Sequence, residues 1–164
     1  MTIPQSEYQR FGRTKQAKEA SNGLSFEILL VDDEPPILSA LSLCLKDAHH
    51  RVTTALSGQD ALDLLHHKPF DLVVTDLQMP GIDGITLMRR VRDLRSNARV
   101  VIMTGSVLSD SIRRLIFREA DGFLAKPFSL SELHHTVSSC LGSEILPPGP
   151  CRRDLSESLE ALPP

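Results

Sequence analysis

The sequence has no apolar run long enough to cross a membrane. A bilayer-spanning helix needs about 20 consecutive apolar residues, and no stretch of this 164-residue chain approaches that length. Residues 1–25 also have no apolar core of the kind that a secretory signal peptide carries. The sequence therefore predicts a cytoplasmic protein that does not insert into a membrane.

Cysteine and net charge are also low. Cys44 and Cys140 fall on apolar helical faces and Cys151 lies near the C-terminus, a pattern that fits reduced thiols better than a disulfide framework. The net charge of −3 gives no argument for nucleic acid as a direct partner. A glycine-rich phosphate loop ending in Lys-Ser or Lys-Thr is absent from the sequence, so nucleotide hydrolysis is not supported.

Five short apolar runs alternate with five amphipathic segments. The runs predict strands at 27–31, 51–55, 72–76, 100–103 and 122–125. The segments predict helices from Pro35 to Ala48, from Ser57 to the 66–69 stretch, and at 85–96, 108–119 and 129–141. This alternation predicts an α/β fold, a doubly wound parallel sheet of flavodoxin-like strand order 2-1-3-4-5.

The ends of the chain differ from this pattern. Residues 1–25 are polar and predict a flexible N-terminal extension, residues 26–142 form the predicted domain, and residues 143–164 predict a Pro-rich tail that is disordered or forms one short helix. Only 23 residues follow Leu141. We therefore expect a single-domain protein, with a fragment of a larger protein as the alternative.

Polar side chains follow four of the predicted strands. Asp32 and Asp33 follow the first, Asp76 ends the third, Thr104 follows the fourth and Lys126 follows the fifth. Because parallel strands end at one edge of a sheet, and ligands bind at that edge, these groups predict a site. Two carboxylates about 4 Å apart repel by roughly 4 kcal/mol at an effective dielectric constant of 20. The group can hold a proton or bind a cation, and oxygen ligands on an open surface suit the hard cation Mg²⁺. The alternative is a set of loop-capping aspartates without metal.

Asp76 is the candidate nucleophile of this site. A carboxylate can attack phosphorus, and Lys126 can offset the charge of the transferred group. Thr104 can donate its hydroxyl to a phosphoryl oxygen. The alternatives are a solvated lysine and a threonine that bonds its own backbone.

These residues, in this order, resemble the receiver domain of two-component response regulators over about Phe26 to Leu141. The resemblance implies that Mg²⁺ or Mn²⁺ is bound by Asp33, Asp76 and the backbone carbonyl of Gln78, with Asp32 acting through a bound water. It further implies a cis Lys126–Pro127 peptide bond and a switch formed by Thr104 and Phe123, for which ordinary core packing of Phe123 is the alternative. It places Gln78 and Ser106 where family members tune the loss of phosphate.

The implied function is bacterial phosphorelay signal transduction. A sensor histidine kinase or a histidine phosphotransfer protein would phosphorylate Asp76, and the fourth helix, fifth strand and fifth helix would then bind a downstream protein. A homodimer is a further implied option. The chain would not be an enzyme beyond self-catalysed phosphotransfer and dephosphorylation.

Other functions remain as alternatives. A receiver-like adaptor would bind its partner without phosphorylation. An aspartyl phosphatase is disfavoured because Asp32-Asp33-Glu34 is not the Asp-x-Asp pattern of those enzymes. The arginines of the third helix predict a solvated face rather than a DNA surface, and the paired histidines predict solvated side chains rather than a zinc site. These residues are Arg89, Arg90, Arg92 and Arg95, and His49, His50, His66, His67, His134 and His135.

Overall fold

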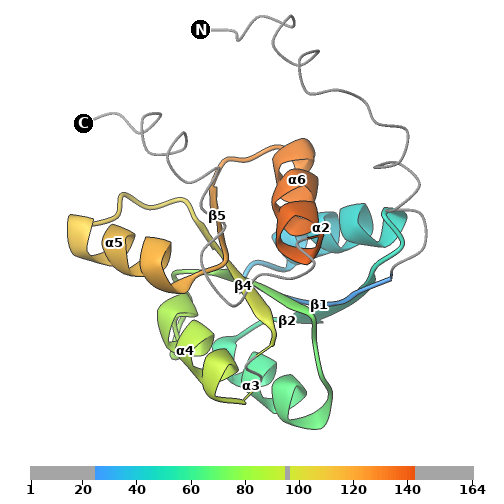
Figure 1. Ribbon diagram of the computed structural model, residues 1–164, viewed down its shortest axis with the longest axis horizontal. Helices are drawn as coiled ribbons and strands as arrows, with labels where there is room; N and C mark the ends of the chain where they lie inside the picture. Colours follow the sequence, from blue (N-terminus) through green and yellow to red (C-terminus); the bar gives the residue numbers. More distant parts are fainter. Residues whose placement is uncertain (1–24, 95–96, 143–164) are drawn as a thin grey trace, which may run out of the picture.

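The computed structural model describes residues 25–94 and 97–142. The predicted N-terminal extension (apart from Ser25), the Pro-rich tail, Cys151 and Arg95 lie outside these ranges. Strands and helices alternate along the described chain (Figure 1). In order they are β1 (Glu27–Val31), α2 (Pro35–Asp47), β2 (Arg51–Ala55), α3 (Gly58–His67), β3 (Leu72–Asp76), α4 (Gly84–Leu94), β4 (Arg99–Thr104), α5 (Asp110–Glu119), β5 (Gly122–Ala125) and α6 (Leu130–Leu141).

The five strands form one parallel sheet in the order β2-β1-β3-β4-β5. The predicted flavodoxin-like order is therefore confirmed. The register brings the carboxyl ends of the strands level: Val31 lies opposite Thr75, Asp76 opposite Met103, and Thr104 opposite Ala125. One edge of the sheet thus carries all the loops on which the sequence places its polar groups.

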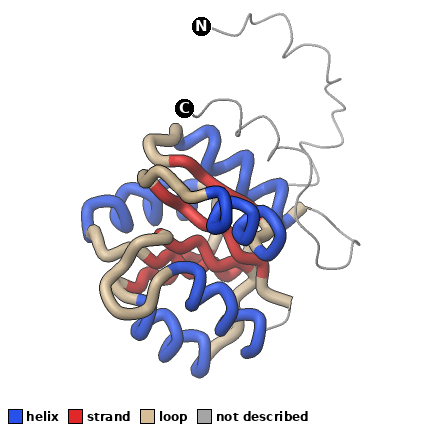
Figure 2. The backbone as a smooth tube through the Cα atoms, turned by 90° about the vertical axis from the view of Figure 1, so that its left-hand side faces the viewer, coloured by secondary structure: helices blue, strands red, loops and turns tan. Residues whose placement is uncertain are grey.

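Helices cover both faces of the sheet (Figure 2). Side chains of successive strand residues point to opposite faces, and β1 shows the result: Ile28 and Leu30 pack with α2 and α6, whereas Leu29 and Val31 pack with the helices α3, α4 and α5. Each fully buried side chain of this size contributes about 1.5–3 kcal/mol of hydrophobic stabilisation. Among the described residues, no helix has the length and apolar character to cross a bilayer.

Side-chain caps mark the starts of α3, α5 and α6. Ser57 accepts a hydrogen bond from the amide of Asp60 at 3.1 Å, and Ser129 with Glu132 forms a capping box, as the sequence predicts. The start of α5 differs from the prediction of residue 108. Ser109 accepts from the amide of Ile112, so the helix begins at Asp110. Both ends of α5 are capped, by the Ser109 hydroxyl at the start and by the amide of Ala120 at the end, but Ile116 is the only buried residue of the helix.

The prediction that the arginines of the third helix, α4, form a solvated face is partly wrong. Arg92 is half-buried and donates to the carbonyl of Glu119 at 2.7 Å and to Asp121 Oδ2 at 2.9 Å. Asp121 is buried and also accepts from Arg99 at 3.1 Å. An unpaired buried carboxylate would be costly, so these arginines are needed as its partners. Leu94, the last residue of α4, is 38% exposed.

Candidate functional site

Asp76 ends β3 at the centre of the sheet, and its residue is 8% exposed. Its Oδ2 accepts a hydrogen bond from the amide of Gln78 at 2.7 Å, which fixes the carboxylate against its own loop. Gly84, at the start of α4, closes this loop from the other side: a Cβ at Gly84 would lie 2.4 Å from the carbonyl oxygen of Asp76. The loop between β3 and α4 therefore folds tightly around Asp76 because residue 84 has no side chain.

Lys126 joins Asp76 to Asp32. Its Nζ donates to Asp76 Oδ1 at 2.5 Å and to Asp32 Oδ2 at 2.7 Å. Asp32 is fully buried, and its Oδ1 accepts from the amide of Glu34 at 2.9 Å. Burial alone would lower the pKa of Lys126, but its hydrogen bonds to Asp32 and Asp76 outweigh burial and raise that pKa above its ordinary value. The ammonium therefore stays charged between the two carboxylates.

Backbone contacts hold Lys126 in this position. Its amide donates to the carbonyl of Thr104 at 2.7 Å, which ties the end of β5 to the end of β4. The Lys126–Pro127 peptide bond is cis.

Thr104 lies beside this network and is bonded to its own loop. Its residue is 4% exposed, and its Oγ1 accepts from the amide of Ser106 at 3.2 Å. The Ser106 hydroxyl in turn donates to Gln78 Oε1. A chain of contacts therefore runs from Thr104 through Ser106 to Gln78, whose amide holds Asp76. A Cβ at Gly105 would meet only Lys126 Cβ, at 3.5 Å.

Asp33 stands apart from the other acidic groups. It is exposed and makes none of the hydrogen bonds that join Asp32, Lys126 and Asp76. Within residues 25–94 and 97–142, no three His, Cys, Asp or Glu side chains are gathered closely enough to hold a metal ion. The predicted set of carboxylates is therefore assembled only in part.

The site still has the chemistry that a divalent cation requires. Each oxygen of Asp32 and Asp76 accepts a bond from one protein donor, so each keeps a second lone pair for another ligand. Three carboxylates and one ammonium, with Asp33 included, leave a formal charge of −2. A divalent cation would neutralise that charge, and oxygen donors are those that Mg²⁺ prefers. The residues present therefore fit such an ion.

Phe123, the candidate switch residue, packs in the core on the α5 side of the sheet. Its ring centroid lies 6.1 Å from that of Phe117 on α5, with the rings tilted by 45°, which is within the range of favourable aromatic pairs. Sequence reasoning missed Phe117 and Gly84. Phe117 lies three and four residues after Arg114 and Arg113 on α5, and this helical spacing alone does not indicate that the Phe117 ring contacts β5.

Four of the paired histidines, His49, His66, His67 and His135, are exposed as the sequence predicts, whereas His50 and His134 are half-buried. Nε2 of His134 lies 2.9 Å from the sulfur of Cys44, between α6 and α2. His50 is half-buried with its ring against Phe26, and burial, together with His134 and His49, lowers its pKa. These imidazoles fill the space between α2 and α6 and belong to the packing of the fold.

Comparison with known proteins agrees with this geometry. The sequence model described as "Response regulator receiver domain" matches residues 28–138. Response regulator ArlR of Staphylococcus aureus is 34% identical over 115 residues, which are 70% of this chain and 52% of that protein. The chain thus spans about half the length of the curated relatives it matches.

Solved structures give the same result. Chemotaxis protein CheY4 of Vibrio cholerae has a TM-score of 0.65 and 27% identity, and the match covers 72% of this chain and all of that chain. Response regulator protein TrrA of Thermotoga maritima, in complex with Mg²⁺ and BeF, has a TM-score of 0.64 and 31% identity over 71% of this chain and 99% of that one.

Proposed function

Because the chain belongs to the receiver domain family of response regulators, we propose that Asp76 accepts a phosphoryl group from the phosphohistidine of a sensor kinase or a histidine phosphotransfer protein. The observation that carries the proposal is the position of Lys126. Its ammonium bonds to both Asp76 and Asp32 at the end of the central strand. A carboxylate with a fixed cation at its side is suited to receive a further negative group.

The reaction requires one bond exchange. An Asp76 oxygen attacks phosphorus, the bond between phosphorus and the imidazole nitrogen of the donor breaks, and its electron pair remains on that nitrogen. A proton from water goes to the leaving imidazole, so the products are an acyl phosphate on Asp76 and a neutral histidine on the partner. Lys126 offsets the charge that accumulates on the phosphoryl oxygens.

A divalent cation would complete this charge balance. Asp33, Asp76 and the carbonyl of Gln78 would hold Mg²⁺ or Mn²⁺, with Asp32 acting through a water, and the bound ion would neutralise phosphoryl oxygens that Lys126 does not reach.

The phosphoryl group would then change the conformation of the neighbouring loop. It adds about −1.5 to −2 charges, and the Thr104 hydroxyl, which now accepts from Ser106, would turn to donate to it. Phe123 would follow, and the surface of α5, β5 and α6 would change for a downstream protein. The shift requires only that the phosphoryl group bind one of two states better. No catalytic role beyond this self-phosphorylation and its reversal is proposed.

Intact mass measurement tests the proposal. The protein is incubated with acetyl phosphate with and without Mg²⁺, as wild type, as Asp76→Ala and as Asp93→Asn, a control at an exposed carboxylate of α4. We expect a Mg²⁺-dependent phosphoryl adduct in the wild type and in the control, but not in Asp76→Ala. A folded wild type that gains no adduct would favour a receiver-like adaptor that works without phosphorylation.

A further inference from the structure

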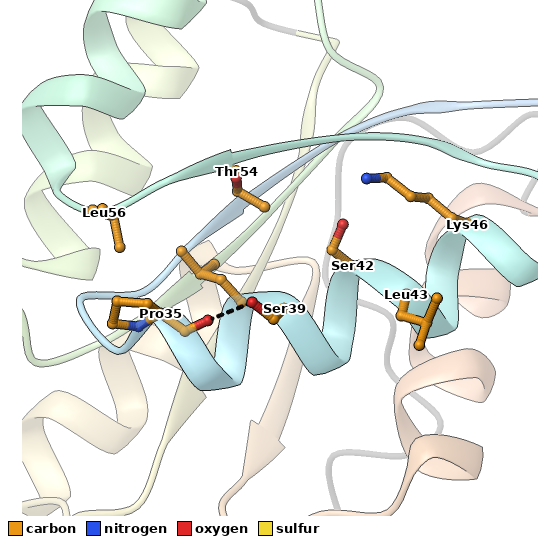
Figure 3. Close-up of a pocket in the computed structure, with 8 residues that line it drawn as sticks. Pro35, Ser39, Ser42, Leu43, Lys46, Thr54 and Leu56 are labelled. Atoms are coloured by element: carbon orange, nitrogen blue, oxygen red, sulfur yellow. Dashed lines mark hydrogen bonds between the residues drawn. The ribbon is translucent and has the colours of Figure 1, made fainter.

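A groove of about 550 Å³ lies between α2 and the edge strand β2 (Figure 3). Helix α2 contributes Ser42, Leu43 and Lys46, strand β2 contributes Thr54, and Leu56 follows that strand. The groove is on the side of α2 that faces away from α6, because residues two positions from Cys44, which contacts α6, are turned by about 200° around a helix. It is therefore separate from the site around Asp76.

Among the polar side chains of the groove, the Ser39 hydroxyl donates to the carbonyl of Pro35 at 2.9 Å, whereas Ser42 and Lys46 have no protein partner within the described residues. Ser42 is 6% exposed, and within the described part of the chain its hydroxyl makes no hydrogen bond. Solvent reaches this oxygen, so a bound group can take the place of water there. Lys46 is the only charged residue of the lining, and Figure 3 shows its side chain extending over the groove towards β2. A carboxylate would accept hydrogen bonds from both groups.

Apolar side chains flank these polar groups. Six large apolar residues are exposed in the described part of the chain, and two of them, Leu43 at 64% and Leu56 at 50%, line this groove. Leu56 lies near Pro35 at one end of the groove and Leu43 lies near Lys46 at the other (Figure 3), and apolar side chains exposed along one groove indicate an interaction site more than scattered ones do. The groove is thus suited to an aliphatic side chain next to an acidic one.

The backbone of β2 adds a third feature. Strand β2 pairs only with β1, at the edge of the sheet. The amide of Arg51 donates to Phe26, and the carbonyl of Ala55 accepts from Asp32, so the backbone groups of 51, 53 and 55 face β1. Those of Val52 and Thr54 consequently face away from the sheet. A free strand edge of this kind can pair with an extended segment of another chain.

We propose that the groove between α2 and β2 binds an extended segment of a partner protein in which an acidic residue lies two positions from an aliphatic one. The segment pairs its backbone with Val52 and Thr54. Residues two apart in a strand point to the same side, so both side chains enter the groove. The carboxylate reaches Lys46 and Ser42, and the aliphatic side chain packs towards Leu56, at the Pro35 end of the groove (Figure 3). Binding requires no phosphoryl group on Asp76.

A titration followed by two-dimensional ¹H–¹⁵N NMR tests this proposal. The full ¹⁵N-labelled chain, unphosphorylated, is titrated with the synthetic peptide acetyl-Ser-Leu-Thr-Glu-Val-Thr-amide. We expect saturable shifts of the amides of Ser42, Leu43, Lys46, Val52 and Thr54. Replacing Glu by Lys in the peptide should weaken binding at least tenfold, and so should N-methylation of its central peptide bonds.

Charge reversal separates this contact from nonspecific attraction. Lys46→Glu should weaken binding of the Glu peptide at least tenfold and restore binding of the Lys peptide. Arg114→Glu makes the same charge change on an exposed position of α5 and should leave both affinities unchanged. Lys46 is exposed, and the spectrum itself reports whether each variant is folded. Shifts confined to other faces, the absence of shifts at millimolar peptide, or equal affinity of wild type and Lys46→Glu would overturn the proposal.

Discussion

Nζ of Lys126 lies 2.5 Å from Oδ1 of Asp76, although 50 residues separate the two in the sequence. The contact exists because β3 and β5 end at the same edge of the sheet, with β4 between them. It places a positive charge beside the carboxylate of the proposed acceptor before any partner binds.

Lys126→Gln should therefore impair both chemistry and folding. Without the ammonium, the fully buried Asp32 faces Asp76 without a shared counter-charge, and losing one partner of such a group costs about 1–3 kcal/mol or more. We expect a lower urea midpoint in Mg²⁺-free buffer, partial recovery on adding Mg²⁺, and little or no adduct with acetyl phosphate. The control is Lys68→Gln, which removes an exposed ion pair with Glu27 worth roughly 0–1 kcal/mol. Equal midpoints for the two variants would contradict the prediction.

Gly84→Ala should destabilise the loop that carries Asp76. The new Cβ would lie 2.4 Å from the Asp76 carbonyl oxygen, so the backbone must move, at a cost of about 1–3 kcal/mol. Gly105→Ala is the matched control, because its Cβ would meet only Lys126 Cβ at an ordinary 3.5 Å. Urea denaturation of both variants decides the matter, and a Gly84→Ala protein as stable as Gly105→Ala would show that the loop can adjust.

The contact between Gln78 and Ser106 should slow the loss of phosphate. It links the loops after β3 and β4 across the outer side of Asp76, where water must approach an acyl phosphate. Gln78→Ala should shorten the lifetime of the adduct several-fold while changing the free energy of unfolding by no more than about 0.5 kcal/mol, as is usual for an exposed residue. Decay of the adduct, followed by intact mass after removal of acetyl phosphate, gives the rate. Identical decay in wild type and variant would rule out this role.

The capping box of α6 should make stability depend on acid pH. Hydrogen bonds from the backbone amide of Ser129, and next from its hydroxyl, lower the pKa of Glu132 below 4.5, its ordinary value. A carboxyl whose folded pKa is depressed contributes stability above the unfolded pKa and loses it as pH falls through the folded pKa. Glu132→Ala should thus have a lower urea midpoint than wild type at pH 7, and the gap should narrow once the pH falls below 4.5, the ordinary pKa of the carboxyl. A gap that is constant with pH would exclude the carboxylate as its source.

The regular parts of this fold follow from local sequence. The apolar runs of β1 and β3 indicate strands that are buried on both faces, and Ser57 and Ser129 indicate helix starts through a spacing of three residues. The family resemblance and the sheet order are both confirmed. They could be predicted because the alternation of strands and helices, and the residues at the strand ends, can be recognised in short stretches of the chain.

Contacts between distant residues could not be predicted in this way. The pairing of Arg92 with Asp121 joins residues 29 apart, and the helical pattern alone assigned Arg92 to the solvated face. Phe117 meets Phe123 only because α5 crosses β5. The position of Asp33 outside the Asp32–Lys126–Asp76 network likewise depends on the path of the loop after β1, which composition and spacing do not determine.

Helix α5 has one buried residue, Ile116, with Phe117 and Glu119 making further, partly buried contacts, whereas α4 buries Gly84, Leu87, Met88 and Val91. Local opening of a segment requires less free energy when fewer apolar contacts hold it. The amide hydrogens of α5 should therefore exchange with solvent through detachment of this helix alone, while those of β3 exchange only when the whole domain unfolds. The proposed signalling surface would then be the part of the molecule that requires the least work to rearrange.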